Sequence, residues 1–74
     1  METIEFQLDR EFIALNDLLK ITGVADSGGA GKLMVASGDV TVDGQQELRK
    51  TCKIRVGQVV MVGDDVKIVV SAES

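Results

Sequence analysis

A short alternating run of residues that ends in Asp-Gly limits the folds that this chain can adopt. Val40 and Val42 alternate with polar neighbours, and Asp43 and Gly44 follow at once. The tight turn of a two-residue β-hairpin needs positive φ at both central residues, which this dipeptide tolerates better than most. The sequence therefore predicts a hairpin with one strand over residues 40–42 and a return strand over residues 45–49.

Further segments show the same period-two alternation, which is typical of half-buried strands. Residues 4–8 alternate apolar and polar side chains, and residues 54–56 resume the pattern after the hairpin. Residues 59–62 and 66–70 are rich in valine and isoleucine and are separated by a turn-forming Gly-Asp-Asp, which predicts a second hairpin. We therefore expect a small, mostly antiparallel sheet with an additional N-terminal strand.

Apolar residues at helical spacing predict a first helix over residues 11–22, ended by Gly23. Its buried face would be formed by Phe12, Leu15, Leu18 and Leu19. The proposed order of strand, helix, helix and sheet is that of an α+β fold, in a single domain over residues 1–74.

Asp26 or Ser27 can cap a second helix, because either side chain can accept a hydrogen bond from a free backbone N–H. Gly38 would end this helix, and Lys32 would point to solvent. Its buried face would be formed by Ala30, Leu33, Met34 and Ser37. Because only a few residues join the two helices, we expect them to pack as a compact pair.

Three glycines precede Lys32 at the start of the second helix. A P-loop would need a glycine in place of Asp26 and a hydroxyl in place of Leu33, so we do not expect that class of nucleotide site. Bare backbone at Gly28 and Gly29 would let free N–H groups of a helix N-terminus approach an anion, and Lys32 adds a full charge. The alternatives are a flexible turn, or a close contact with the first helix that excludes a side chain.

Composition bears on several classes of function. One cysteine and no histidine leave no internal disulfide, no zinc site of the Cys/His type and no Cys–His catalytic pair. No carboxylates are evidently paired for acid–base work, so we predict no enzyme, no cofactor and no metal. The first residues do not resemble a signal peptide, and the longest apolar run, residues 59–62, is far too short to cross a bilayer. We therefore expect a cytoplasmic protein without membrane contact.

Charge is distributed unevenly along the chain. The net charge is −4, yet residues 27–58 carry five lysines or arginines against three acids. Four of these bases lie within seven residues, with no acid between them, at Arg49, Lys50, Lys53 and Arg55. A solvated surface is one interpretation of such a cluster, and a site for a polyanion is the other. Arg49, Lys53 and Arg55 share parity, so an extended chain would present them on one side.

Cys52 lies among these bases, which would lower the pKa of an exposed thiol. We favour the simpler interpretation that Cys52 is a small neutral residue facing the core.

The order of these motifs resembles the RNA-binding domain named after small-subunit ribosomal protein S-four, the αL motif, over residues 12–60. The resemblance is closest to small single-domain bacterial members of that family. It rests on the leucine-spaced segment at residues 15–19, the helix start at Ser27, "GDVTVDG" at residues 38–44 and "RKTCKIRVG" at residues 49–57. The chain departs from the family pattern at three positions. Many members have an arginine at the position of Gly28, the family prefers asparagine at the position of Asp43, and a basic residue is common at the position of Cys52.

The resemblance implies a surface for structured RNA on the second helix and the loop after the hairpin. Carried onto this sequence, its residues are Ser27, Gly28, Gly29, Lys32, Arg49, Lys50, Lys53 and Arg55. Five cations could contact about four or five phosphates, which corresponds to a log–log salt slope of about −3. Since Phe6 and Phe12 are the only aromatic residues, we expect no stacking platform for unpaired bases and recognition by RNA shape.

Two hypotheses follow. The first is a monomeric, non-catalytic protein that binds RNA of the ribosomal or transfer RNA class. The alternative is a protein-interaction adaptor that docks to a translation or RNA-modifying factor, to which the acidic ends of the chain and exposed sheet edges would be suited.

Overall fold

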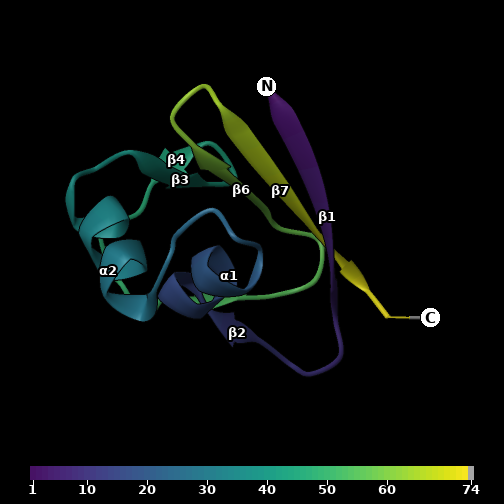
Figure 1. Ribbon diagram of the computed structural model, residues 1–74. Coiled ribbons are helices and arrows are strands. Elements are labelled where there is room, and N and C mark those ends of the chain that lie inside the picture. Colours follow the sequence, from purple (N-terminus) through teal and green to yellow (C-terminus); the bar gives the residue numbers. More distant parts are fainter. Residues whose placement is uncertain (74) are drawn as a thin grey trace.

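Two sheets and two helices make up the computed structural model of the protein, which describes residues 1–73 (Figure 1). Five strands form one sheet in the order β1-β7-β6-β3-β4, and β2 and β5 form a separate two-stranded sheet. In chain order the elements are β1 (Glu2–Leu8), β2 (Ile13–Ala14), α1 (Leu15–Ile21), α2 (Gly28–Ala36), β3 (Val40–Val42), β4 (Gln45–Gln46), β5 (Lys53–Ile54), β6 (Val59–Val62) and β7 (Val66–Ala72).

The predicted hairpins are confirmed. β3 pairs with β4 and β6 pairs with β7, both antiparallel. At the first turn Asp43 has a φ of 53° and Gly44 a φ of 84°, the positive values that the Asp-Gly dipeptide predicted. The return strand is shorter than expected, because β4 ends at Gln46 and the chain then leaves the sheet.

The five-stranded sheet is mostly antiparallel, as predicted, but its N-terminal strand runs parallel to its neighbour. β1 pairs with β7 in parallel, with Ile4 opposite Ile68 and Phe6 opposite Val70. Alternation of side chains fixes which face of a strand is buried but carries no information on its direction, so the mixed character of the sheet was not foreseen.

The first helix begins later than predicted. Ile13 and Ala14 form β2, which pairs antiparallel with Lys53 and Ile54 of β5, so α1 starts only at Leu15. The strand pairing therefore takes residues that the helical spacing had assigned to the helix. Phe12 lies outside α1, and its side chain is 36% exposed rather than part of a buried helix face.

The second helix is confirmed, but its buried face is rotated from the predicted one. The Ser27 hydroxyl caps α2 by accepting a hydrogen bond from the Ala30 N–H at 3.1 Å. Gly31 and Val35 are its buried residues, whereas Leu33 is 72% exposed. A Cβ on Gly31 would lie 2.9 Å from the Asn16 carbonyl oxygen, so α2 approaches α1 with its glycine side and turns Leu33 outward.

Of the rest of the predicted face of α2, Ala30 and Met34 are partly buried against the core and Ser37 is exposed.

Both helices cover one face of the five-stranded sheet, and the core fills the space between them (Figure 1). The fully buried side chains are Leu15, Leu18, Leu19, Val35, Val40, Ile54, Val60, Ile68 and Val70. Because α1 contributes three of these and also contacts α2, it is the central element on which the remaining parts are placed. Neither of the helices in residues 1–73 has the length and apolar character needed to span a bilayer.

Candidate nucleic-acid interface

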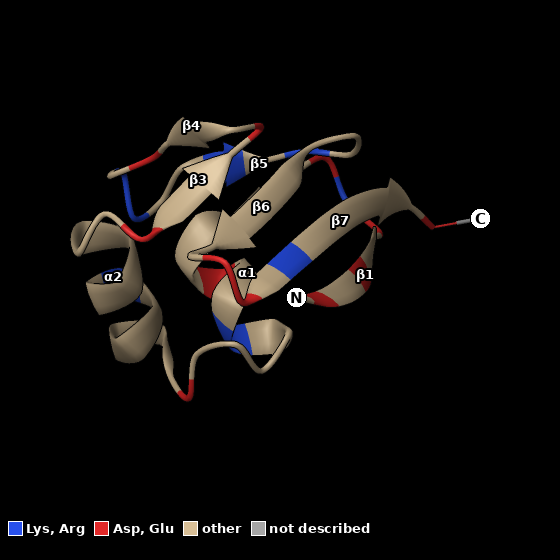
Figure 2. Ribbon diagram, turned by 90° about the horizontal axis from the view of Figure 1, so that it is seen from above, with Lys and Arg blue, Asp and Glu red and all other residues tan. Residues whose placement is uncertain are grey.

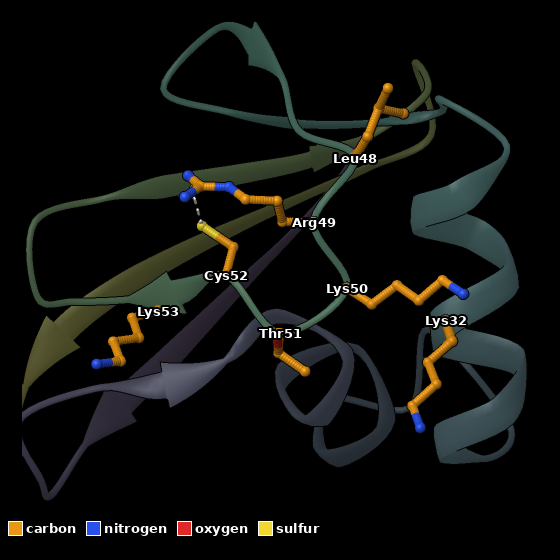
Figure 3. Close-up of a pocket in the computed structure, with 7 residues that line it drawn as sticks. All are labelled: Lys32, Leu48, Arg49, Lys50, Thr51, Cys52 and Lys53. Atoms are coloured by element: carbon orange, nitrogen blue, oxygen red, sulfur yellow. Dashed lines mark hydrogen bonds between the residues drawn. The ribbon is translucent and has the colours of Figure 1, made fainter.

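An open groove of about 850 Å³ lies between α2 and the chain that connects β4 to β5 (Figure 3). We call residues 47–52 the basic loop and this space the basic groove. Its lining residues are Lys32, Leu48, Arg49, Lys50, Thr51, Cys52 and Lys53. The structure thus brings Lys32 together with three of the four clustered bases. Figure 2 shows blue segments in the chain between β4 and β5 and in β5 itself, with red segments nearby before β3, in the β3–β4 turn and just after β4.

The N-terminus of α1 holds the basic loop in place. The Leu15 N–H donates to the Cys52 carbonyl oxygen at 2.9 Å, and the Asn16 N–H donates to the Lys50 carbonyl oxygen at 3.0 Å. No side chain within the described part of the chain caps α1, and these carbonyls satisfy two of the N–H groups that a helix start leaves unpaired. The loop backbone is therefore fixed on the same helix against which α2 packs.

Lys32 and Lys50 form the two sides of the groove. In Figure 3 the Lys50 side chain extends from the basic loop toward α2, where Lys32 is carried on the exposed side of the helix. None of the ion pairs formed among residues 1–73 involves either lysine or Lys53. These three amines are therefore free to meet an anion.

Arg49 is paired, in contrast to the three lysines. Its Nε and Nη2 atoms donate to Glu47 Oε2 and Oε1, each at 3.0 Å, and its backbone N–H also donates to Oε2. These hydrogen bonds hold the pKa of the Glu47 carboxyl at about 2, and the same pairing raises the pKa of Arg49. In Figure 3 the Arg49 side chain points away from Lys32. Its pairing with the Glu47 carboxylate also reduces its contribution to the positive surface.

Arg55 lies outside the basic groove and is also paired, with Glu11 at 3.2 Å. The chain turns at residues 50–51, so the extended geometry that would align Arg49 with Lys53 and Arg55 does not occur. Lys53 and Arg55 instead meet at the ring of Phe12, with Lys53 Nζ 4.9 Å and Arg55 Cζ 5.7 Å from its centroid.

The start of α2 offers unpaired backbone donors. Ser27 Oγ is used by the Ala30 N–H, whereas the N–H groups of Gly28 and Gly29 have no acceptor among residues 1–73. A Cβ at Gly28 would meet no atom of residues 1–73 within 4 Å, so the space on the side-chain side of this residue is open. Side chains on a helix lean toward its N-terminus, so Lys32 lies over the same turn.

Cys52 is partly buried against the core, as the simpler interpretation predicted. Burial raises the pKa of its thiol, and the neighbouring Glu47 carboxylate raises it further. Within residues 1–73, no group of three or more acidic, Cys or His side chains is placed to hold a metal ion.

Sequence reasoning missed the acids that partner the arginines. Glu47 is two residues before Arg49 and could have been recognised as a local partner, but Glu11 reaches Arg55 only through the β2–β5 pairing. It also missed Asn16, whose backbone joins the groove to α1, and the exposure of Phe12.

Comparison with known proteins identifies the family to which the fold belongs. The family model described as "S4 domain" matches residues 6–71. The YbcJ protein of Escherichia coli (strain K12), named for an inferred RNA-binding role, is 47% identical over 58 residues, which cover 77% of this chain and 83% of that protein. YbcJ of Shigella flexneri, an uncharacterised protein, matches with the same identity and coverage.

The fold is similar to the solution structure of E. coli YbcJ, with a TM-score of 0.63 and 41% identity. The match covers 93% of this chain and 87% of YbcJ, whose structure is described as revealing an αL motif involved in RNA binding. The αL motif predicted from the sequence is thereby confirmed as the fold. With nearly its whole length matched and this level of identity, the chain belongs to the S4 domain family.

Proposed function

We propose that this protein binds structured RNA, of the ribosomal or transfer RNA class, without catalysing a reaction. The observation that carries the proposal is the placement of Lys32 and Lys50, from distant parts of the sequence, on the two sides of one groove. Neither amine forms an ion pair with any group in residues 1–73. The membership of the S4 domain family and the RNA-binding role given to E. coli YbcJ and its αL motif support the same conclusion.

The phosphate backbone is the natural ligand for such a groove. Lys32, Lys50 and Lys53 supply free charges, and the amides of Gly28 and Gly29 supply donors at the positive end of α2. Ser27 orients this turn through its cap. Arg49 and Arg55 would add to the surface once an RNA phosphate competes with Glu47 and Glu11 for them. We therefore propose recognition of the RNA mainly by its shape and backbone.

The proposal is tested by reversing the groove charges. The variant K32E/R49E/K50E/K53E should lose all binding to unfractionated transfer RNA and to total ribosomal RNA in a gel-shift titration, with an unchanged circular dichroism spectrum. The matched control is K67E, because Lys67 lies on β7, outside the basic groove, and it should bind as wild type. Undiminished binding by the fourfold variant would reject this surface.

The adaptor hypothesis has one observation in its favour. β1 is an edge strand of the five-stranded sheet and carries exposed acids at Glu2 and Glu5, which suits a basic strand from another protein. The two functions are distinguished by salt and nuclease. RNA affinity that falls steeply between about 50 and 200 mM salt supports RNA binding, whereas stoichiometric capture of one translation factor after nuclease treatment supports the adaptor.

A further inference from the structure

Phe12 is an exposed aromatic residue at the edge of the proposed RNA surface. Its side chain is 36% exposed, and Lys53 and Arg55 both lie over its ring, at 4.9 and 5.7 Å from the centroid. The only other aromatic residue, Phe6, is packed against the core. The small number of aromatic residues predicted no stacking platform for unpaired bases, and Phe12 was expected in a buried helix face. The structure instead leaves one aromatic ring exposed, at Phe12.

The β2–β5 pairing builds this cluster. Ile13 pairs with Ile54 and Ala14 with Lys53, so Phe12 and Arg55 are the next residues out from the pair and Lys53 lies diagonally across. Glu11 holds the Arg55 guanidinium through a contact of 3.2 Å. The ring and the guanidinium are thus both positioned by backbone pairing and an ion pair.

Lys53 connects this cluster to the basic groove, since it lines the groove and also lies over Phe12. An RNA stem whose phosphates occupy the groove would therefore pass next to the aromatic ring, where a bulged or frayed base could reach it. RNA-binding proteins take up unstacked bases at such positions on aromatic rings and on Arg guanidinium planes.

We propose that Phe12, Arg55 and Lys53 form a subsite for one unpaired nucleotide of the bound RNA. The base takes the place on the Phe12 ring that the Lys53 amine occupies in the free protein, beside the Arg55 guanidinium, and Lys53 turns to the adjoining phosphate. This inference rests on the proposed function and adds a preference for RNA stems that contain a bulge or a frayed end.

The test uses two RNA hairpins with the same stem, one fully paired and one with a single bulged adenosine. Wild type should bind the bulged hairpin more tightly, and F12A should lose about tenfold in affinity for it while binding the paired hairpin as before. F12W should retain the preference, because tryptophan also offers a stacking face. V56A is the matched control, since Val56 is an exposed apolar residue in the segment that follows β5 and lies outside the cluster.

A second measurement follows the ring directly. Phe6 and Phe12 are the only aromatic residues, so the aromatic proton spectrum contains two rings. The Phe12 resonances should shift upfield when the bulged hairpin is added, and those of Phe6 should not move.

The outcomes separate this inference from the function on which it rests. If wild type binds both hairpins equally, or F12A keeps the preference for the bulge, the subsite is rejected while RNA binding stands. If F12L binds the bulged hairpin with the same affinity as wild type, an apolar side chain without a ring is sufficient, and the proposed stacking of a base is rejected. If wild type binds neither hairpin at low salt, both the function and the subsite are overturned.

Discussion

The backbone of Gly31 in α2 lies so close to Asn16 in α1 that a Cβ at position 31 would come within 2.9 Å of the Asn16 carbonyl oxygen. The N–H of the same Asn16 donates to the Lys50 carbonyl oxygen at 3.0 Å. One residue of α1 is therefore in contact with both sides of the basic groove. The distance between Lys32 and Lys50 depends on these two backbone contacts.

Replacing Gly31 with alanine should destabilise the protein. Alanine is the better helix former by about 1 kcal/mol, but its Cβ would press against a backbone oxygen that cannot rotate away. The helices must then separate, which we expect to lower the free energy of unfolding by about 1–3 kcal/mol. Urea unfolding followed by circular dichroism measures this change.

Gly29→Ala is the matched control for that experiment. A Cβ at Gly29 would meet only Ser27 Oγ, at the ordinary contact distance of 3.8 Å. Helix propensity should then dominate and raise stability by up to about 1 kcal/mol. Equal changes in the free energy of unfolding for Gly31→Ala and Gly29→Ala would show that the contact between α1 and α2 does not restrict position 31.

Asp43 should matter to stability through its backbone conformation and its side chain. It adopts positive φ, and its carboxylate accepts from the Val59 N–H at 2.9 Å and from Gln58 Nε2 at 3.3 Å. Asp43→Ala removes both hydrogen bonds and the tolerance for this φ, at a cost of about 2 kcal/mol. Asp43→Asn keeps an acceptor for the Val59 N–H and should cost less than half as much. Chemical denaturation of the two variants measures this difference. Equal losses of stability in Asp43→Ala and Asp43→Asn would show that the hydrogen bond to the Val59 N–H contributes nothing.

Glu47 should give stability an acid-dependent component. Its pKa is lowered from its ordinary value of 4.5 to about 2 by the hydrogen bonds from Arg49. A carboxyl with a lowered folded-state pKa stabilises the protein fully above its unfolded-state pKa, and this stabilisation is lost as pH falls toward the folded-state pKa. Because Arg49 is largely exposed, solvent screening keeps this contribution small at neutral pH.

The measurement is the difference in unfolding free energy between wild type and Glu47→Gln at several pH values. Wild type should be the more stable above about pH 5, and the difference should shrink steadily toward about pH 2. A difference that stays constant over this range would show that the Arg49 pairing does not stabilise the folded state.

Local patterns predicted the elements whose signals are short-range. The Asp43-Gly44 turn needed positive φ at two positions, and Ser27 supplied a cap that few other residue types could replace. The resemblance to the S-four-type domain then predicted the αL fold. It also pointed to Lys32, Arg49, Lys50 and Lys53, which the structure does bring to one groove.

The remaining features depend on pairings between distant segments. The β2–β5 pairing shortens α1 and exposes Phe12, but the helical spacing of the leucines carries no sign of it. The rotation of α2 follows from the contact of Gly31 with Asn16, which outweighs the preference for burying Leu33. Likewise, counting charges along the chain could not show that Glu11 meets Arg55.

The salt dependence of RNA binding shows whether RNA phosphates occupy the basic groove. With four or five phosphate contacts, the logarithm of the association constant for unfractionated transfer RNA should fall with the logarithm of salt concentration at a slope of about −3. Removing two of the contacts in K32A/K50A should reduce the magnitude of the slope by about 1.4, while K67A should leave it unchanged. A slope that is the same in K32A/K50A and wild type would contradict the account, because RNA phosphates would then not contact the basic groove.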